Sequence, residues 1–413
     1  MAALYLRVSV LKKFCLLFSN TYGQFTDKNR QIFIGSESKS FTALCIMQLE
    51  EKGLLNLDDD FTKYLPQYHF DKKISVRALL NQTSGFDNHA KLINFKITET
   101  YGSYEYANVN YDLLGMIVEA VSGKSYAEYL RENVLEPLGM NNTFGDCRVA
   151  KVRENKLLGN RNWFGFFVKS DALYPGKRSW FHEPAGYIAS TPDDYEKYLR
   201  MYLNYGVSEN GERILSETGI RRMWYENVSI YDSGARYVMG FNCEPGDYSE
   251  MIYHAGQVEN SITFMVIFPQ KNLAMNFMVN SGDEFGVNNL MQDVTASVMS
   301  FLADGKFNEV QPNAYFKTHL ILDIFYLLLI LVAVLILILS LKGKTRNKIA
   351  KIVFAVFAYV IFPLFLLYGA ELTFRTPLWT VKLFVPDLFC VIVLSVILCE
   401  LGAVIRIARK MRA

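Results

Sequence analysis

A serine and a lysine three residues apart are the first side chains in this chain that could do covalent chemistry. Ser36 and Lys39 are spaced i and i+3, so on a helix they share one face and their tips lie close together. A serine hydroxyl becomes a good nucleophile once a base removes its proton, and a neutral lysine amine can act as that base. Because the solution pKa of lysine is ~10.4, this role near pH 7 needs a pKa lowered by about three, which burial supplies. The apolar residues from Phe41 to Leu49 predict a buried helix, so the pair is expected at the start of a core helix.

The spacing alone is a weak signal, since it also occurs at Ser9 and Lys12. Serine and lysine are common residues, and roughly one such match is expected by chance in a chain of this length. Tyr5–Leu11 mixes apolar and polar residues as a β-strand does, and on a strand residues i and i+3 point to opposite faces. Ser9 and Lys12 are therefore not expected to act together.

Tyr106 and Asn108 form a second motif with useful chemistry. The phenol can relay a proton, and the amide can hold a carbonyl or amide group of a substrate. The same Tyr-x-Asn pattern occurs at Tyr202 and Tyr225, where a helix end and a surface turn are expected. The pattern therefore gains weight only from the other motifs.

A third motif, His254-Ala255-Gly256, ends a predicted strand. A glycine there permits close approach, and we expect a substrate to lie against the strand. The backbone N–H of Gln257, with that of Ser36, is predicted to form an oxyanion hole. A single histidine in a strand is more often structural, so it is the combination with Ser36 and Lys39 that favours a site.

The elements that must position these residues follow from the hydrophobic periodicity. Helices are expected after Ser36 and near 74–80, 111–121, 127–135, 193–205 and 284–302. Period-two runs predict strands near 5–11, 14–18, 237–243, 250–254, 261–268 and 273–279, with Lys12 and Lys13 at the first turn. The predicted fold class is α/β (α+β): an antiparallel sheet made from both chain ends, flanked by helices, with a helical subdomain inserted between.

Composition excludes several classes of function. The net charge of the 413-residue chain is +2, which gives no indication of a nucleic-acid partner. The six cysteines form no Cys-x-x-Cys pair, and the chain has neither a metal-binding His-Glu-x-x-His pattern nor a glycine-rich phosphate loop. No metal or cofactor is predicted.

With these motifs in order, the chain resembles the serine β-lactamase and penicillin-binding-protein-like hydrolases, in their class C β-lactamase and D,D-peptidase branch. The resemblance runs from about Tyr5 to Gly305. It rests on six segments: Ile34-Gly35-Ser36-Glu37-Ser38-Lys39-Ser40-Phe41-Thr42-Ala43-Leu44, Leu57-Asp58-Asp59-Asp60 with Tyr64-Leu65-Pro66, Leu79-Leu80-Asn81-Gln82-Thr83-Ser84-Gly85, Tyr106-Ala107-Asn108, Pro137-Leu138-Gly139-Met140 and His254-Ala255-Gly256.

The resemblance implies a role for each candidate residue. Ser36 would be the acylated nucleophile, Lys39 its base, and Tyr106 the group that passes a proton toward the leaving group. Substrate binding would fall to four residues: Asn108, His254, Gly256 and Gln257. The family needs no metal, and the acyl-enzyme is released by water or another acceptor.

Three departures from the family pattern bear on function. His254 stands where β-lactamases of this kind carry lysine, which argues against an efficient β-lactamase because histidine is only partly charged near neutral pH. Gln82 replaces a histidine common before Thr-Ser-Gly. The helix and export signal with which family members begin are not seen before Tyr5, so we expect that Met1 is not the true start or that the gene is fragmentary.

The C-terminal part predicts a membrane tail. The domains expected are a hydrolase domain over 1–303, a linker over 304–318 and three transmembrane helices within 319–408, near 320–341, 352–372 and 383–408. Basic residues gather between the first two spans and after the third, whereas the loop between the second and third spans carries only Arg375 and Lys382. The positive-inside tendency places the C-terminus in the cytoplasm and the hydrolase domain outside a multi-pass cell membrane protein.

The function expected is a membrane-anchored serine hydrolase that forms an acyl-enzyme through Ser36. Its substrates would be D-amino-acid peptides such as cell-wall stems, in the manner of a D,D-peptidase or carboxypeptidase. An esterase or amidase with the same residues, acting on a small ester or a β-lactam-like compound, is the alternative within the family. A non-catalytic penicillin-binding-like membrane protein is the alternative outside enzymology. The oligomeric state and the role of three spans stay open.

Overall fold

The computed structural model describes residues 5–12, 15–23, 29–171, 174–226, 229–230, 235–245, 250–311, 313–342 and 347–411. Contacts divide the chain into two compact units. The first contains residues 1–160, 169–281 and 295–308, and the second contains 161–168, 282–294 and 309–413. Residues 161–168 and 282–294 thus belong to the same unit as the C-terminal helices. The sequence did not indicate this grouping. Lys13 and Phe14, at the first predicted turn, lie outside the described residues.

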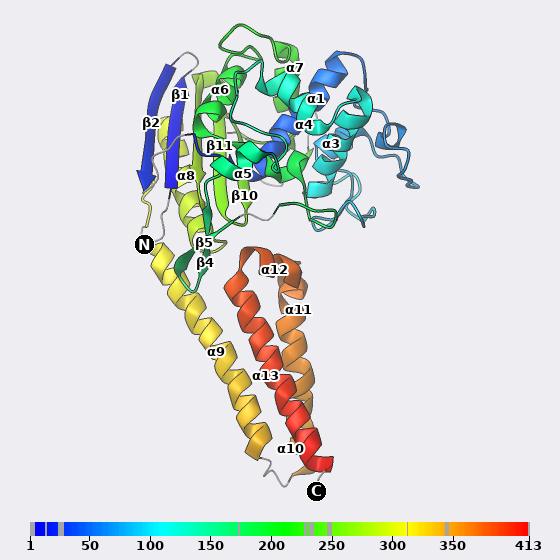
Figure 1. The fold of residues 1–413 in the computed structure, drawn as a ribbon, viewed down its shortest axis with the longest axis vertical. Helices are drawn as coiled ribbons and strands as arrows, with labels where there is room; N and C mark the ends of the chain where they lie inside the picture. The colour runs from blue at the N-terminus through cyan, green and yellow to red at the C-terminus, as the bar shows by residue number, and fades with distance from the viewer. Residues whose placement is uncertain are drawn as a thin grey trace. The chain divides into compact units, whose positions relative to one another are not determined.

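The first unit is built on an eight-stranded antiparallel sheet in the order β2-β1-β12-β11-β10-β9-β8-β7 (Figure 1). The strand from the start of the chain pairs with the last long strand, Leu6 opposite Val279, which confirms a sheet made from both chain ends. The strands are β1 Tyr5–Lys12, β2 Cys15–Gly23, β7 Ser229–Ile230, β8 Arg236–Val238, β9 Phe241–Glu244, β10 Met251–Val258, β11 Ser261–Phe268 and β12 Leu273–Val279.

The helices lie mainly between β2 and β7 in sequence, as the inserted subdomain predicts. They are α1 Ser38–Glu51, α2 Val76–Leu80, α3 Asn108–Ser122, α4 Tyr126–Leu130, α5 Ala150–Asn155, α6 Pro192–Leu203 and α7 Glu217–Tyr225. Short helical turns are η1 Gly35–Glu37, η2 Phe61–Lys63, η3 Arg131–Leu135, η4 Glu183–Tyr187 and η5 Pro269–Lys271. Small strand elements are β3 Ile32–Phe33 with β6 Ala189–Ser190, and β13 Ser281–Gly282 with the hairpin of β4 Gly159–Trp163 and β5 Phe166–Ser170. Helix α8, Val287–Asp304, follows β13.

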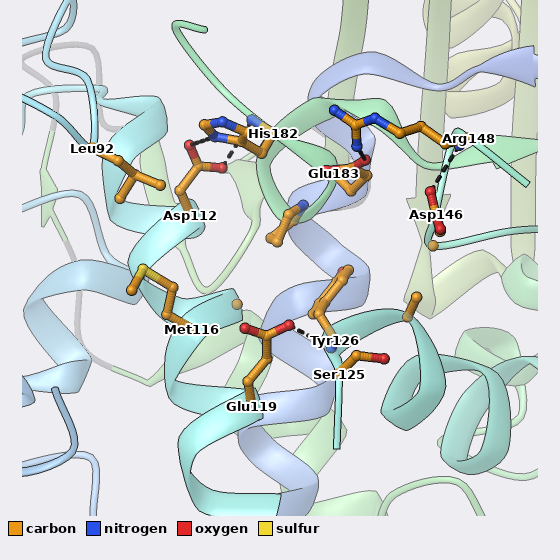
Figure 2. Close-up of a pocket in the computed structure, with 14 residues that line it drawn as sticks. Leu92, Asp112, Met116, Glu119, Ser125, Tyr126, Asp146, Arg148, His182 and Glu183 are labelled. Atoms are coloured by element: carbon orange, nitrogen blue, oxygen red, sulfur yellow. Dashed lines mark hydrogen bonds and ion pairs between the residues drawn. The ribbon is translucent and has the colours of Figure 1, made fainter. Parts of the chain in front are cut away.

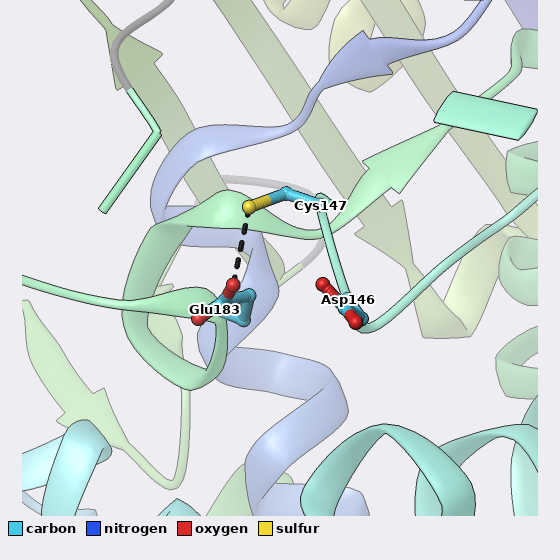
Figure 3. Close-up of side chains that lie close together, drawn as sticks. All are labelled: Asp146, Cys147 and Glu183. Carbon is cyan, nitrogen blue, oxygen red and sulfur yellow. Dashed lines mark hydrogen bonds between the residues drawn. The ribbon is translucent and has the colours of Figure 1, made fainter. Parts of the chain in front are cut away.

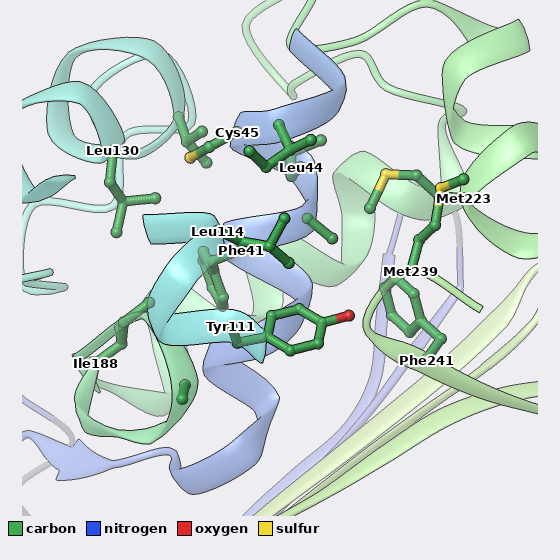
Figure 4. Packing of buried hydrophobic residues seen from close by; sticks show 14 of the residues in the cluster. Phe41, Leu44, Cys45, Tyr111, Leu114, Leu130, Ile188, Met223, Met239 and Phe241 are labelled. Carbon is green, nitrogen blue, oxygen red and sulfur yellow. The ribbon is translucent and has the colours of Figure 1, made fainter. Parts of the chain in front are cut away.

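Helix α1 is the centre of the hydrophobic core. All residues from Ser38 to Leu49 are buried, so the helix is enclosed on every side, as its all-round apolar sequence predicts. Figure 4 shows Phe41, Leu44 and Cys45 of α1 among side chains of α3 and of the segments that follow. Burial of this helix gives the residues at its N-terminus a fixed position.

Two of the predicted strands differ from the structure. The strand expected over 250–254 is β10, which continues to Val258, so His254-Ala255-Gly256 lies within the strand rather than at its end. The run 237–243 forms two short strands, β8 and β9, rather than one. The turn between them has Met239 at φ +41° and Gly240 at φ +88°, a pair of left-handed residues that matches a two-residue hairpin. A side chain at Gly240 would also lie 2.9 Å from the Lys39 carbonyl oxygen, so the turn packs closely on α1.

The second unit contains three helical stretches long and apolar enough to cross a membrane. They are Ala314–Lys342, which is α9, Lys348–Phe374, and Pro386–Met411, which is α13. The middle stretch comprises α10 Lys348–Val356, a π-helical turn at Phe357–Ile361 and α11 Phe362–Phe374, and α12 Leu378–Phe384 precedes α13. Helix α9 begins six residues before the predicted Leu320, so the non-helical segment is shorter than the predicted linker.

Pro363 lies inside the second stretch, directly after the π-helical turn. A proline has no N–H to donate in a helix, and a widened turn is a common local solution. Within this unit α9 and α13 run along each other (Figure 1). The Ser340 hydroxyl of α9 also forms a hydrogen bond with the Tyr359 hydroxyl. The basic residues Lys344, Arg346 and Arg412 lie outside the described residues.

Candidate active site

The structure brings Ser36 and Lys39 together at the start of the core helix. Ser36 is in the turn η1 and Lys39 is in the first turn of α1, so the i, i+3 spacing directs both side chains the same way. The Lys39 Nζ lies 3.0 Å from the Ser36 Oγ. Lys39 is fully buried, whereas Ser36 is partly exposed. A substrate can therefore reach the serine while the amine stays shielded from water.

Lys39 has two further partners, both acceptors. Its Nζ donates to Asn108 Oδ1 at 2.7 Å and to the Ala185 carbonyl oxygen at 2.7 Å. A neutral amine has two N–H groups and one lone pair, so with both N–H groups donated to these acceptors the lone pair is directed at Ser36. Burial lowers the pKa of Lys39 to about 7, against the opposing charge of Asp112. The amine is thus both oriented and poised to accept the serine proton near neutral pH.

Asp112 and His182 form a charge pair behind Lys39. Asp112 Oδ2 lies 2.8 Å from His182 Nδ1, and Asp112 Oδ1 accepts the His182 backbone N–H at 3.0 Å (Figure 2). Burial by itself lowers the pKa of His182, but the hydrogen bond and charge of Asp112 raise it overall. Both residues line a pocket of about 360 Å³ with Met116 and Glu119 of α3. The pair anchors the start of η4, whose Ala185 carbonyl holds Lys39.

Tyr106 and Asn108 lie at the start of α3. The Lys39 Nζ is 4.8 Å from the centre of the Tyr106 ring, and the Tyr106 ring centre is 6.4 Å from that of His254. Asn108 is buried and its Oδ1 is engaged by Lys39, so its amide orients the base. The predicted contact of Asn108 with a substrate would have to use its NH₂ group.

His254 is buried, 3 % exposed, on β10. Its Nδ1 lies 2.6 Å from the Ala255 carbonyl oxygen, an acceptor, so Nδ1 carries the proton and Nε2 is the acceptor nitrogen. Nε2 has no hydrogen-bond partner among the described residues. Burial and the neighbouring Lys39 charge lower the pKa of His254 to about 3. The ring is therefore neutral in the physiological pH range and presents a lone pair.

Gly256 and Gln257 lie against the turn that carries the serine. A side chain at Gly256 would meet the Ile34 carbonyl oxygen at 1.9 Å, and one at Gly35 would meet the Gln257 nitrogen at 2.2 Å. The absence of a side chain at Gly256 thus makes room for the turn that carries Ser36. The sequence had predicted that it makes room for a substrate. Strand β9 pairs with β10 only at Met251–Tyr253, so it stops short of this region. The joint oxyanion role of the Ser36 and Gln257 N–H groups stays a prediction.

Sequence reasoning missed Asp112, His182 and the Ala185 carbonyl. A carboxylate within the apolar helix 111–121 was a usable signal for Asp112, because a buried charge needs a partner. Ala185 acts through its backbone, so its side chain carries no signal.

Asp146, Cys147 and Glu183 also lie close together, with their ligand atoms within 4.8 Å of one another (Figure 3). The Cys147 thiol donates to Glu183 Oε1 at 3.1 Å, and the Arg148 guanidinium binds the same oxygen at 3.0 Å. Burial and the Glu183 charge raise the pKa of Cys147. A protonated thiol and a resident guanidinium do not fit a metal centre.

Comparisons with known proteins agree on one family. The model of the family described as Beta-lactamase matches residues 22–297. Protein flp of Staphylococcus aureus (strain MRSA252) is 24 % identical over 283 residues, which cover 61 % of this chain and 53 % of that protein. The chain thus spans about half the length of that relative.

Two solved structures show the same fold. A penicillin-binding protein homologue from Pyrococcus abyssi, described as octameric, superimposes with a TM-score of 0.61 at 23 % identity and covers 76 % of each chain. D-amino acid amidase from Ochrobactrum anthropi SV3, complexed with L-phenylalanine, has a TM-score of 0.58 at 21 % identity and covers 72 % of this chain and 95 % of that one. Because the family model matches two thirds of this chain, the chain belongs to the Beta-lactamase family.

Proposed function

We propose that this chain is a membrane-anchored serine hydrolase that forms an acyl-enzyme through Ser36 and acts on amide or ester bonds of D-amino-acid compounds. The observation that carries the proposal is the environment of Lys39, whose two acceptors, Asn108 Oδ1 and the Ala185 carbonyl, leave its lone pair for Ser36. A buried lysine with this set of partners is expensive to maintain, and general-base catalysis accounts for it.

The reaction would proceed in two steps. Ser36 Oγ attacks the substrate carbonyl carbon as its proton moves to Lys39, and the backbone N–H groups of Ser36 and Gln257 bind the oxyanion. The tetrahedral intermediate collapses and expels an amine or alcohol. This leaving group takes the proton held by Lys39 by way of the Tyr106 hydroxyl. Water then attacks the acyl carbonyl, releases the carboxylic acid and returns the proton to Ser36.

The state of His254 favours one class of substrate over another. A carboxypeptidase substrate places a terminal carboxylate next to the scissile bond, and a cationic side chain at this position would attract it. A neutral ring with Nε2 as acceptor offers no positive charge, and it suits an N–H or O–H donor of the substrate. This supports an amidase or esterase acting on D-amino-acid derivatives, with cell-wall stem peptides as the second candidate.

The C-terminal helices would hold the enzyme in a membrane. Lys342, Lys348 and Lys351 flank the connection between the first two spans, and Arg406 and Arg409 end the third. By the positive-inside tendency these residues face the cytoplasm, and the hydrolase domain faces outward. Labelling of a C-terminal epitope tag only after cells are permeabilised would support this orientation. Labelling in intact cells would contradict it.

The first experiment is labelling of Ser36. Membranes that contain the full chain are treated with a fluorophosphonate probe and, separately, with a fluorescent penicillin. We expect covalent labelling that disappears in Ser36→Ala and persists in Ser122→Ala, which replaces the last residue of α3. A folded Ser36→Ala chain that labels as strongly as the parent would contradict the proposal.

A matched pair of substrates then tests the role of His254. The same D-alanyl-D-alanine derivative is compared with a free C-terminal carboxylate and with that carboxylate converted to an amide. We expect the larger kcat/KM for the amide. A strong preference for the free carboxylate would instead favour a carboxypeptidase. That result would leave the proposed role of Ser36 unchanged.

A further inference from the structure

The tip of the β4–β5 hairpin presents an unusual apolar surface. Phe164 is 40 %, Phe166 75 % and Val168 46 % exposed. Burying large apolar side chains stabilises a fold, so leaving these side chains in contact with water forgoes that stabilisation. Contiguous exposed apolar residues commonly mark a surface that binds something.

The strand alternation divides this tip into two faces. Phe167 points to the opposite side of β5 from Phe166 and Val168. Its ring stacks on Tyr315 of α9, with ring centres 5.6 Å apart and planes at 20°. Phe167 is therefore packed on α9, whereas Phe166 and Val168 point outward. The partly exposed Phe164 ring meets Tyr326 of α9 edge-on, with ring centres 6.1 Å apart.

Polar contacts fix the tip to the first turns of two apolar helices. Asn162 Nδ2 donates to the Tyr315 hydroxyl at 2.9 Å, and that hydroxyl lies 3.3 Å from the Gly165 carbonyl oxygen. The Phe164 N–H donates to Asp387 Oδ2 at 3.1 Å, at the start of α13. These contacts hold the tip beside the beginning of α9 and of α13.

The residues that the tip contacts show that it lies beside the N-terminal ends of the two helices. Tyr315 is the second residue of α9, and Asp387 is the second residue of α13. If these helices span a bilayer, their first turns lie at the boundary between water and hydrocarbon, where aromatic side chains are enriched. Phe316 and Leu320 of α9 are also outward, 72 % and 61 % exposed. Exposed apolar side chains thus occur both on the tip and in the first two turns of α9, the level that would meet this boundary.

Polar groups near the tip are directed inward instead. Asp283 and His319 form an ion pair with Nε2 and Oδ2 2.7 Å apart, and both side chains are at most 8 % exposed. These two polar groups are therefore buried and paired, whereas Phe166 and Val168 are exposed, a separation that suits an interfacial element.

We propose that residues 164–168 form a membrane-interface anchor whose partner is the phospholipid bilayer, with Phe166 inserted at the boundary between headgroups and acyl chains. The inference rests on the membrane-spanning role of α9 and α13 in the proposed function. It adds a second kind of membrane contact, made by a β-hairpin rather than by a helix.

The test uses the full chain in proteoliposomes of phosphatidylcholine brominated at a shallow or a deep acyl-chain position. Phe166→Trp adds a tryptophan at the tip, and the emission of the four native tryptophans is recorded with the unsubstituted chain and subtracted. We expect the added emission to be blue-shifted and to be lost mainly in the shallow-bromine lipid. Leu328→Trp, at an outward position in the middle of α9, should lose its added emission mainly in the deep-bromine lipid.

The two variants separate the possible failures. Quenching of Leu328→Trp without quenching of Phe166→Trp would overturn the anchor and leave the spans intact, and would indicate that the tip faces water or another protein. Absence of quenching in both variants would overturn the membrane-spanning role and the anchor with it. Neither result would affect the labelling of Ser36.

Discussion

Asp112 accepts both the ring Nδ1–H and the backbone N–H of His182, at 2.8 and 3.0 Å. The other ring nitrogen, Nε2, lies 3.0 Å from the Gly176 carbonyl oxygen. Both ring nitrogens thus face acceptors, which suits a protonated imidazolium. His182 is therefore the hydrogen-bonded partner of the buried Asp112 carboxylate, and the charge of that carboxylate also acts on Lys39 and favours its protonated form.

The effect of the Asp112 charge on Lys39 predicts how acylation depends on pH. Lys39 must be neutral to act as a base, so the rate should rise with pH through about 7, the pKa to which burial lowers it. Asp112 opposes that lowering. Asp112→Asn removes the negative charge, so the midpoint of the profile should move to lower pH by on the order of one unit. The measurement is the rate of fluorophosphonate labelling from pH 5 to 9.

His182→Gln is the matched variant with the opposite expectation. It removes a cation that offsets Asp112, so Lys39 should hold its proton more tightly and the midpoint should rise. Glu183, beside His182, and the Lys39 ammonium are the other charged groups that act on this pair. Shifts of both variants in the same direction would indicate a structural disturbance rather than an electrostatic effect.

Lys39→Met tests the base itself. The variant keeps a long apolar side chain in the buried site and removes the amine. General-base catalysis commonly contributes a factor of about 10²–10⁴, and we expect the rate of Ser36 acylation to fall by that order. A folded variant, judged by circular dichroism, with an unchanged rate would show that another group takes the serine proton.

Glu37, between Ser36 and Lys39 in the chain, should make stability depend on pH. Its carboxyl is fully buried, and burial raises its pKa to about 8, although the Tyr195 and Thr263 hydroxyls offset part of this. The unfolded chain loses this proton near pH 4.5, so the stabilising contribution is full below that pH and is lost as the pH rises through 8. The total change is on the order of 5 kcal/mol.

Glu37→Gln should remove most of this pH dependence, because an amide of the same shape does not ionise. Thermal unfolding in detergent is compared at pH 5 and pH 9 for the parent, Glu37→Gln and Glu154→Gln, an exposed residue of α5. We expect a smaller decrease between the two pH values in Glu37→Gln alone. An equal decrease in all three proteins would assign the effect to other groups.

Gly256→Ala should disrupt the site through the backbone. The added methyl would meet the Ile34 carbonyl oxygen at 1.9 Å, and overpacking of this kind costs roughly 1–3 kcal/mol. Because Ile34 directly precedes the turn that carries Ser36, labelling should fall with stability. Gly176→Ala, where a side chain would meet no atom within 4 Å, is the control and should change neither quantity.

The sequence predicted strands β11 and β12 with the correct bounds because each is an unbroken β-rich run between turn residues. The three long apolar helices near the C-terminus were equally clear, since length and hydropathy alone identify helices able to span a membrane. The β8–β9 hairpin was missed because its turn, Met239-Gly240, has an apolar first residue and does not resemble Asn-Gly or Asp-Gly. Prediction thus worked best where a pattern repeats over many residues.

For the candidate site, spacing was enough to pair Ser36 with Lys39, since a helix fixes the relation between residues i and i+3. It could not give the partners that set the lysine pKa. Asp112 and Ala185 come from segments 73 and 146 residues away in the chain, and Ala185 acts through a carbonyl that every residue has. Such contacts depend on tertiary packing and leave no local pattern.

The close approach of Gly35 and Gly256 has a consequence for how this enzyme can change. At these two glycines the turn that carries Ser36 and strand β10 meet backbone against backbone, and the Thr263 hydroxyl donates to the Ile34 carbonyl oxygen beside them. The distance between the turn and β10 is therefore set by the radii of backbone atoms, and no substitution can make it smaller. Almost any side chain at either glycine would increase it. Divergence in substrate choice is consequently expected at the rim, where side chains can be exchanged, while the reacting centre keeps its dimensions.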